Sequence, residues 1–308
     1  MRGHAGPAVA GLLCLLAGSL AASPIDADAG SRGFKFLQIL PDARVAGLGF
    51  AATTAAMGSP TALATNPAGL AGVGGFSASA THVEWLATIR DEYLGAALPG
   101  FGGAFGVALR TQSSGDIPLR NLDSPDPLGT YGVHDAALTV AYARRSGPVA
   151  WGVGLNLIHE KIYLDGVTAY AADFGLAWSA NRWSAGAALH SVGRSGRLDA
   201  QRVPLPWDAQ AGAAYRLPLG THALTTVADV RYAPDYDETL HLGLEADLTR
   251  MLALRVGYRT PFRELTGAAG LTAGVGLRLG PVGLDYAYIP ERDGLGAGHL
   301  FTLAFGRR

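Results

Sequence analysis

The chain has 308 residues, of which 49% are hydrophobic and 16% are charged, and its formal net charge is −1. A nucleic-acid-binding protein normally carries a basic surface, so this near-neutral balance argues against that class. Glycine is frequent, with 43 residues. These glycines follow no three-residue period, which excludes collagen and is typical of a protein with many strands and tight turns.

The beginning of the chain has the pattern of a secretory signal peptide. Arg2 and His4 precede the apolar run AVAGLLCLLAGSLAA, which small residues follow. We expect residues 1–22 to be removed on export. A lipoprotein anchored through Cys14 is the less favoured alternative, because this cysteine lies inside the apolar run. If it leaves with the signal peptide, the mature chain has no cysteine and no disulfide.

Residues 23–74 are rich in alanine and other small residues and lack the alternation of the rest of the chain. We predict short helices near Ala43–Ala56 and from Pro60 to Thr65. The second helix should end before Asn66, because the following proline disfavours helical backbone in the residue before it. The run Pro67–Leu70 then predicts a tight turn that leads into the first strand.

From about residue 75 onward, short segments alternate apolar residues with small or polar ones, which is the period of a β-strand. In MLALRVGYRT, for example, Leu252, Leu254 and Val256 fall on one face and Arg255 and Arg259 on the other. Alternation of this kind fits both a soluble sandwich and a membrane barrel. We predict fourteen strands, near residues 75–86, 88–98, 102–112, 130–144, 149–163, 167–179, 182–193, 205–217, 222–233, 237–248, 251–260, 270–279, 282–290 and 297–306.

The second face of the strands and the lengths of their connections favour the barrel. The second face carries Gly, Ala, Asp and Arg rather than Lys and Thr, which suits a crowded interior better than a solvated surface. Connections after even-numbered strands are short, such as RSGP and NR, whereas QSSGDIPLRNLDSPDPLG follows the third strand. Short turns at one end, long loops at the other and an even strand count are typical of outer-membrane barrels.

We therefore predict an all-β fold: a 14-stranded antiparallel transmembrane β-barrel over residues 75–308, with residues 23–74 as a small helical N-terminal plug. The expected location is the bacterial outer membrane. The expected partners are outer-membrane lipids and lipopolysaccharide, together with the barrel-assembly machinery. We expect no nucleic acid as a partner.

The sequence contains no complete catalytic motif. His159-Glu160 begins H-E-x-x-H, but position 163 is a tyrosine. GRSGR does not complete G-x-S-x-G, and the lone G-x-G runs in GVGLNL and GVGLRLG indicate close strand packing rather than phosphate binding. The loop that holds Asp123 and Asp126 could bind a cation, although a solvated loop is favoured. We expect neither an enzyme nor a bound cofactor or metal.

Charged residues of both signs fall on the predicted inner face of the strands. A channel selective for ions of one sign would need one sign of charge to predominate in its lining. We therefore expect these charges to form pairs that hold the plug. They are Asp173, Asp208, Arg216, Asp229, Arg231, Glu245, Asp247, Arg255, Arg259, Arg278 and Asp285.

The plug segment and the strand pattern together resemble a known family. The stretch FLQILPDARVAGLGFAATT, the run ATNPAGLA from Ala64 to Ala71 and the fourteen strands resemble the FadL-like outer-membrane barrels and, within them, the PorV/PorQ branch. The resemblance implies an N-terminal segment folded inside the barrel, with a plug motif at Asn66, Pro67 and Ala68. An asparagine amide can bond backbone groups beside the proline, and the proline fixes the bend.

The resemblance also implies a function. FadL-type members transport hydrophobic compounds, and PorV-type members are components of the type IX route of protein secretion. The implied partners are hydrophobic small molecules or secretion-system proteins. A non-transporting structural or adhesive barrel is the alternative from another class.

Overall fold

The computed structural model describes residues 32–85, 89–120, 126–198, 201–234, 236–261, 270–290 and 296–306. The predicted signal peptide, with Cys14, and Asp123 of the acidic loop lie outside the described residues. The predicted division of the chain after residues 22 and 74 stays a prediction.

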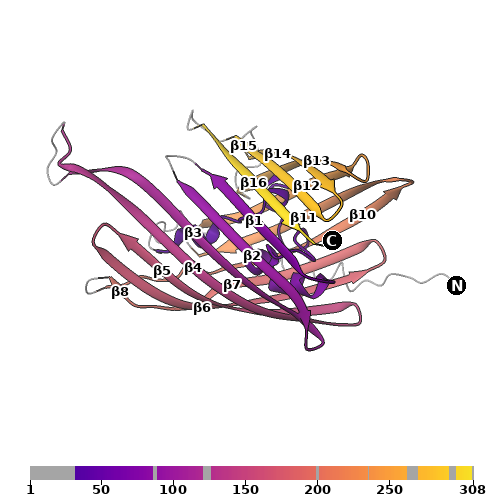
Figure 1. Cartoon of the computed structure of the whole chain (residues 1–308), viewed down its shortest axis with the longest axis horizontal. Helices are drawn as coiled ribbons and strands as arrows, with labels where there is room; N and C mark the ends of the chain where they lie inside the picture. Colours follow the sequence, from indigo (N-terminus) through magenta and orange to yellow (C-terminus); the bar gives the residue numbers. More distant parts are fainter. Residues whose placement is uncertain are drawn as a thin grey trace.

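Fourteen strands form a closed antiparallel barrel, as predicted (Figure 1). Each pairs with the next in the chain, and the last pairs with the first. They are β1 (Ser77–Glu84), β2 (Arg90–Gly100), β3 (Gly103–Leu119), β4 (Gly129–Ser146), β5 (Val149–Ile162), β6 (Asp165–Ala180), β7 (Trp183–Ser195), β10 (Asp208–Leu219), β11 (His222–Ala233), β12 (Tyr236–Asp247), β13 (Leu252–Pro261), β14 (Leu271–Leu279), β15 (Val282–Pro290) and β16 (Ala297–Phe305). Two further strands, β8 (Arg197–Leu198) and β9 (Gln201–Arg202), form a hairpin between β7 and β10.

The strand connections alternate in length largely as predicted. Two residues join β2 to β3, β4 to β5, β6 to β7, β10 to β11 and β14 to β15. Asn181 and Gly220 in these turns adopt positive φ angles of 55° and 67°, the backbone that tight hairpins require. At the other end the connections run longer, for example over residues 196–207, although β5–β6 and β11–β12 are also short.

The long loop predicted after the third strand is wrong. β3 continues to Leu119 and β4 begins at Gly129, so most of that stretch is a hairpin, with a register shift between Ser114 and Ile117. The last β3 residue paired with β2 is Ser113, and beyond it the hairpin projects past the other strands (Figure 1). Proline is typical of loops, so Pro118 predicts a loop. It is tolerated in this part of β3 because, among the described strands, β3 has a partner here on one side only, and a residue whose N–H would point to the unpaired side needs no hydrogen bond.

Large apolar side chains cover the outside of the barrel. Examples that remain exposed are Leu94, Leu98, Val107, Leu109, Leu155, Leu176, Leu254 and Leu303. Water-soluble proteins rarely expose apolar area on this scale, whereas a transmembrane barrel presents such a surface to lipid. No helix in the described ranges is long and apolar enough to cross a membrane.

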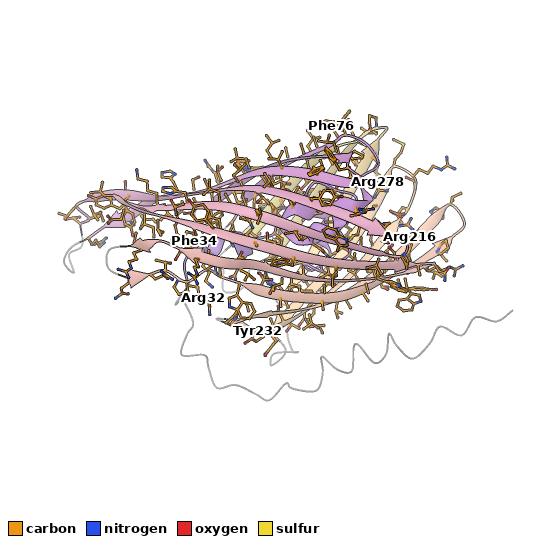
Figure 2. All side chains as sticks on the ribbon, turned by 90° about the horizontal axis from the view of Figure 1, so that it is seen from below. Arg32, Phe34, Phe76, Arg216, Tyr232 and Arg278 are labelled. Carbon is orange, nitrogen blue, oxygen red and sulfur yellow. The ribbon has the colours of Figure 1, made fainter. Side chains whose placement is uncertain are left out.

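The N-terminal segment lies inside the barrel as four short elements. They are η2 (Lys35–Gln38), α2 (Ala43–Gly47), α3 (Ala62–Thr65) and η3 (Pro67–Gly72). Arg32 and Phe34 lie toward one end of the barrel, and Phe76, Arg216 and Arg278 toward the other (Figure 2). We call the described residues 32–76 the plug.

The plug helices are shorter than predicted. The helix expected over Ala43–Ala56 ends at Gly47, because Gly49 and Phe50 take positive φ angles of 68° and 66° and turn the chain. The helix expected from Pro60 begins at Ala62. Pro67 starts the 3-10 helix η3 rather than a simple turn.

Candidate functional site: the plug and its seat in the barrel

The Asn66-Pro67-Ala68 motif joins α3 to η3. The Nδ2 atom of Asn66 donates to the carbonyl of Thr53 in the plug, at 2.9 Å, and to that of Leu176 on β6, at 3.1 Å. Its Oδ1 atom accepts from the N–H of Ala68 at 3.1 Å. One buried side chain therefore ties the motif to itself, to the rest of the plug and to the barrel wall.

Two glycines of the barrel wall allow the Asn66-Pro67-Ala68 motif to lie directly against the strand backbone. Gly152 on β5 and Gly175 on β6 are direct cross-strand partners. A Cβ atom at Gly152 would overlap the backbone of Pro67 and Ala68, and one at Gly175 would overlap Oδ1 of Asn66. Gly152 begins the G-x-G run in GVGLNL, where close packing between strands was predicted; the close contact at Gly152 is instead with the plug.

Asn66→Ala is expected to lower the free energy of unfolding by about 1–3 kcal/mol, because buried backbone groups lose their partners. Denaturant unfolding in detergent, followed by tryptophan fluorescence, measures this change. The control is Gln201→Ala, which removes an exposed amide on β9 and should change stability by at most about 0.5 kcal/mol. Equal stability of the two variants would contradict a structural role for the Asn66 side chain.

A second seat lies on β12 and β13, where Gly243 and Gly257 are direct partners. Cβ atoms at these positions would collide with the plug backbone at Leu48 and Gly49. Two pairs of facing glycines, on different parts of the wall, therefore let the plug backbone lie directly on the strands.

Glu245 is the centre of a buried ion network beside this second seat. Its carboxylate lies 2.7 Å from both Nε and Nη2 of Arg44 and 2.7 Å from Nε of Arg255. Nη1 of Arg255 lies 2.7 Å from Oδ1 of Asp285. The side chains of Glu245 and Arg255 are 1% and 0% exposed. Since Arg44 belongs to α2 and the others to β12, β13 and β15, the network joins the plug to the wall.

Arg44 is the member of this network that the sequence analysis missed. Burial disfavours the charged guanidinium, but the carboxylates of Glu245, Asp285 and Asp42 together outweigh burial, so the pKa of Arg44 is raised. Asp42 caps α2 by accepting from the N–H groups of Arg44 and Val45. Asp42 and Arg44 are the two charged residues within the otherwise uncharged stretch PDARVAGLGFAATT. Two charges in such a stretch were the sequence feature that could have indicated their contact with the wall.

Two other wall residues bind the plug backbone directly. The Asp229 carboxylate accepts from the N–H of Thr53 at 2.7 Å and from its hydroxyl at 2.9 Å. His241 on β12 donates from Nδ1 to the carbonyl of Gly49 at 2.6 Å. Asp229 was among the predicted lumen charges, whereas His241 was not.

Asp208 gathers a further polar cluster. It accepts from Nη2 of Arg231 at 3.0 Å and lies 3.2 Å from Nδ1 of His190. Arg231 also donates to the carbonyl of Gln38 at 3.4 Å, and Nε2 of His190 donates to that of Thr65 at 2.8 Å. Both basic side chains therefore connect Asp208 to the plug.

Asp173 makes its contacts within the wall. It accepts from Nδ2 of Asn156 at 2.8 Å and from the N–H of Ser191 at 2.7 Å. Ser191 has a positive φ of 55° beside the register shift between β6 and β7. These bonds support that irregularity, and the pairing of Asp173 with another charge to hold the plug stays a prediction.

The remaining predicted charges have different surroundings. Arg259 lies over the ring of Phe50, 5.0 Å from its centre, and so contacts the plug. Asp247 pairs with Arg216 at 2.8 Å near the short turns, where the Arg216 side chain is 56% exposed. Arg278 lines a hollow of about 450 Å³ between the plug and the β14–β15 turn.

Polar contacts on β2, β3 and β5 were also missed. Arg110 lies 2.7 Å from the Asp91 carboxylate, and its guanidinium lies 5.4 Å from the ring centre of Phe36. Glu160 accepts from the N–H of Phe34 at 2.6 Å. Like the predicted residues, Asp91, Arg110 and Glu160 are charged residues on the inner face of an alternating strand. The same criterion could therefore have identified them.

Among the described residues, no group of three or more His, Cys, Asp or Glu side chains could hold a metal ion. His159 lies on the exposed side of β5 and contacts Thr168 at 3.0 Å. Most of the buried acidic and basic groups described above contact one another or the plug, and Asp173 is bonded within the wall. The arrangement is that of a fastened plug.

No protein-family model matches the chain, and no curated protein does. Solved structures do match. The P. putida toluene transporter TodX superposes with a TM-score of 0.61 at 10% identity, over 87% of this chain and 99% of TodX. The Ralstonia pickettii toluene transporter TbuX gives 0.55 at 12%, over 88% and 100%. The monoaromatic hydrocarbon channel CymD gives 0.61 at 12%, over 86% and 97%.

At this level of identity the likeness concerns the fold, and it extends over nearly the whole of each of the three channels. The PorV/PorQ branch stays a prediction. The chain has the fold of a FadL-like outer-membrane barrel.

Proposed function

We propose that this protein is an outer-membrane channel for small hydrophobic molecules. The observation that carries the proposal is an apolar hollow of about 500 Å³ on the lipid-facing side of β2–β5. Leu98, Phe105 and Leu155 are among the side chains that line it. An apolar pocket of this size suits a small hydrophobic ligand.

The wall behind the hollow is thin. Gly106 and Ala141 also line the hollow, and both face the barrel interior. A Cβ atom at Gly106 would lie 2.9 Å from Leu63 and 3.1 Å from Leu70 of the plug. Apolar groups therefore lie on both sides of one backbone layer, and the charges of the interior are largely paired, which disfavours ions. The structural neighbours include transporters of toluene and channels for monoaromatic hydrocarbons.

Toluene uptake into vesicles with a lipopolysaccharide outer leaflet tests this function. We expect several-fold faster uptake with the protein than without it, and little conductance of potassium chloride. Ala96→Trp should slow uptake because it fills the hollow, which Ala96 lines. Ala246→Trp is the matched control, on the lipid-facing side of β12. Ion conductance without any toluene uptake would overturn the proposal.

A second candidate is a component of protein secretion of the PorV/PorQ type. It is favoured by the β3–β4 hairpin, which projects beyond Ser113 where β3 pairs, among the described strands, with β4 only. A projecting strand edge can add an extended polypeptide as a further strand. Cross-linking of secreted cargo to Pro118→Cys, together with no toluene uptake, would support this candidate over transport.

A further inference from the structure

A row of polar side chains crosses four adjacent strands on the inner wall. Asp91 on β2 faces Gln112 on β3, Gln112 faces Asp135 on β4, and Asp135 faces Glu160 on β5. Directly opposed residues have Cβ atoms roughly 4.5–5.5 Å apart. The four side chains therefore form one continuous strip, which we call the polar row.

The residues at the two ends of the polar row are hydrogen-bonded, whereas each of the two central residues has one side-chain atom without a partner among the described residues. Asp91 pairs with Arg110, and Glu160 accepts from the N–H of Phe34. Within the described part of the chain, Oδ1 of Asp135 and Nε2 of Gln112 are buried atoms without a hydrogen-bond partner. Asp135 is only 6% exposed.

This arrangement is costly for a purely structural feature. A buried polar atom without a partner costs about 1–3 kcal/mol, and like charges placed directly opposite, as in Asp135 and Glu160, are also destabilising. Buried polar atoms are normally satisfied, and an exception calls for a missing partner such as water or a ligand. Here a free acceptor and a free donor lie on neighbouring strands, and the adjacent Glu160 is bonded to the plug.

A second row of side chains, apolar except for its first residue, lies one step along the same strands. It begins at Arg110, the partner of Asp91, and continues through Ala137, Ile158 and Ala169, which are direct partners in successive ladders. The last three belong to a buried cluster with Phe34 and Phe36 of the plug. A molecule at the polar row would thus have hydrogen-bonding groups on one side and aliphatic and aromatic groups on the other.

We propose that the polar row binds a small apolar molecule that carries one hydroxyl group. The hydroxyl donates its hydrogen to Asp135 and accepts a hydrogen from Gln112, because it is both a donor and an acceptor. A hydrocarbon satisfies neither atom, and an ammonium group, which only donates, leaves Gln112 unsatisfied. A site that hydrogen-bonds a hydroxyl discriminates strongly against the analogue that lacks it. This inference rests on the proposed function and specifies its substrate class.

Equilibrium dialysis of the purified protein in detergent tests the inference, with p-cresol, toluene and 4-methylbenzylamine as probes. We expect p-cresol to bind at least about tenfold more tightly than toluene. Asp135→Ala and Gln112→Leu should each abolish this preference. His134→Ala, which changes the exposed neighbour of Asp135 on the opposite face of β4, should retain it.

Two variants keep the test informative if one of them fails to fold, which heat-dependent gel mobility reveals. Equal binding of p-cresol and toluene to the wild-type protein would overturn the inference. So would an unchanged preference in a folded variant, or tighter binding of the amine than of p-cresol. Failure of the proposed function appears separately, as absent toluene uptake into vesicles, because dialysis needs no transport.

Discussion

Glu245→Ala is expected to destabilise the protein by about 3–5 kcal/mol, the range for removing one partner from a buried ion pair. The loss is large because Glu245 faces two arginines, Arg44 and Arg255, at 2.7 Å. Without the carboxylate, Arg255 keeps Asp285, but Arg44 loses the wall residue that fixes it. The guanidinium of Arg44 then keeps its bond to the carbonyl of Ala55 in the plug but loses its carboxylate partner on the wall.

Two measurements check this result. Denaturant unfolding in detergent micelles gives the stability, and single-channel recording in planar bilayers shows whether the loosened plug admits ions. Asp247→Ala is the matched control, because it breaks an ion pair with an exposed partner, Arg216, and such pairs are worth about 0–1 kcal/mol. A Glu245→Ala protein as stable and as impermeable as the Asp247→Ala protein would show that the network does not hold the plug.

The barrel could be predicted because each strand shows, within its own sequence, the alternation of apolar with small or polar residues. Leu252, Leu254 and Val256 alternate with Ala253 and Arg255 within a few residues, and side-chain direction in a strand has this same period. The structure places the arginine and alanine inside and the leucine and valine outside. Turns such as Asn181-Arg182 are equally local. A pattern confined to ten residues can be recognised without knowing which distant residues the strand contacts.

The seat of the plug could not be predicted in this way, since its contacts join distant parts of the chain. Arg44 and Glu245 are 201 positions apart, and nothing near either residue indicates the other. The polar row likewise depends on strand register, which places Gln112 opposite both Asp91 and Asp135. The end of β3 was missed for a different reason: Pro118 is a poor residue for a central strand but is acceptable at an edge.

Gly152→Ala is expected to displace the plug motif, and Gly154→Ala on the same strand is its matched control. Both glycines face inward on β5. A Cβ atom at Gly152 would overlap plug backbone at Pro67 and Ala68, whereas one at Gly154 would lie 3.5 Å from Asp173, an ordinary contact. Backbone cannot rotate aside as a flexible side chain can. Overpacking of this kind costs about 1–3 kcal/mol.

The control variant sharpens the comparison because alanine in a strand is intrinsically better than glycine by roughly 0.5–1 kcal/mol. Gly154→Ala should therefore be as stable as the wild-type protein or slightly more stable, and its conductance should be unchanged. Gly152→Ala should lose stability and show raised conductance, since the motif can no longer lie against β5. If the two variants unfold at the same denaturant concentration and remain equally closed, the glycine pair does not position the plug, and Asn66 must be held by its hydrogen bonds alone.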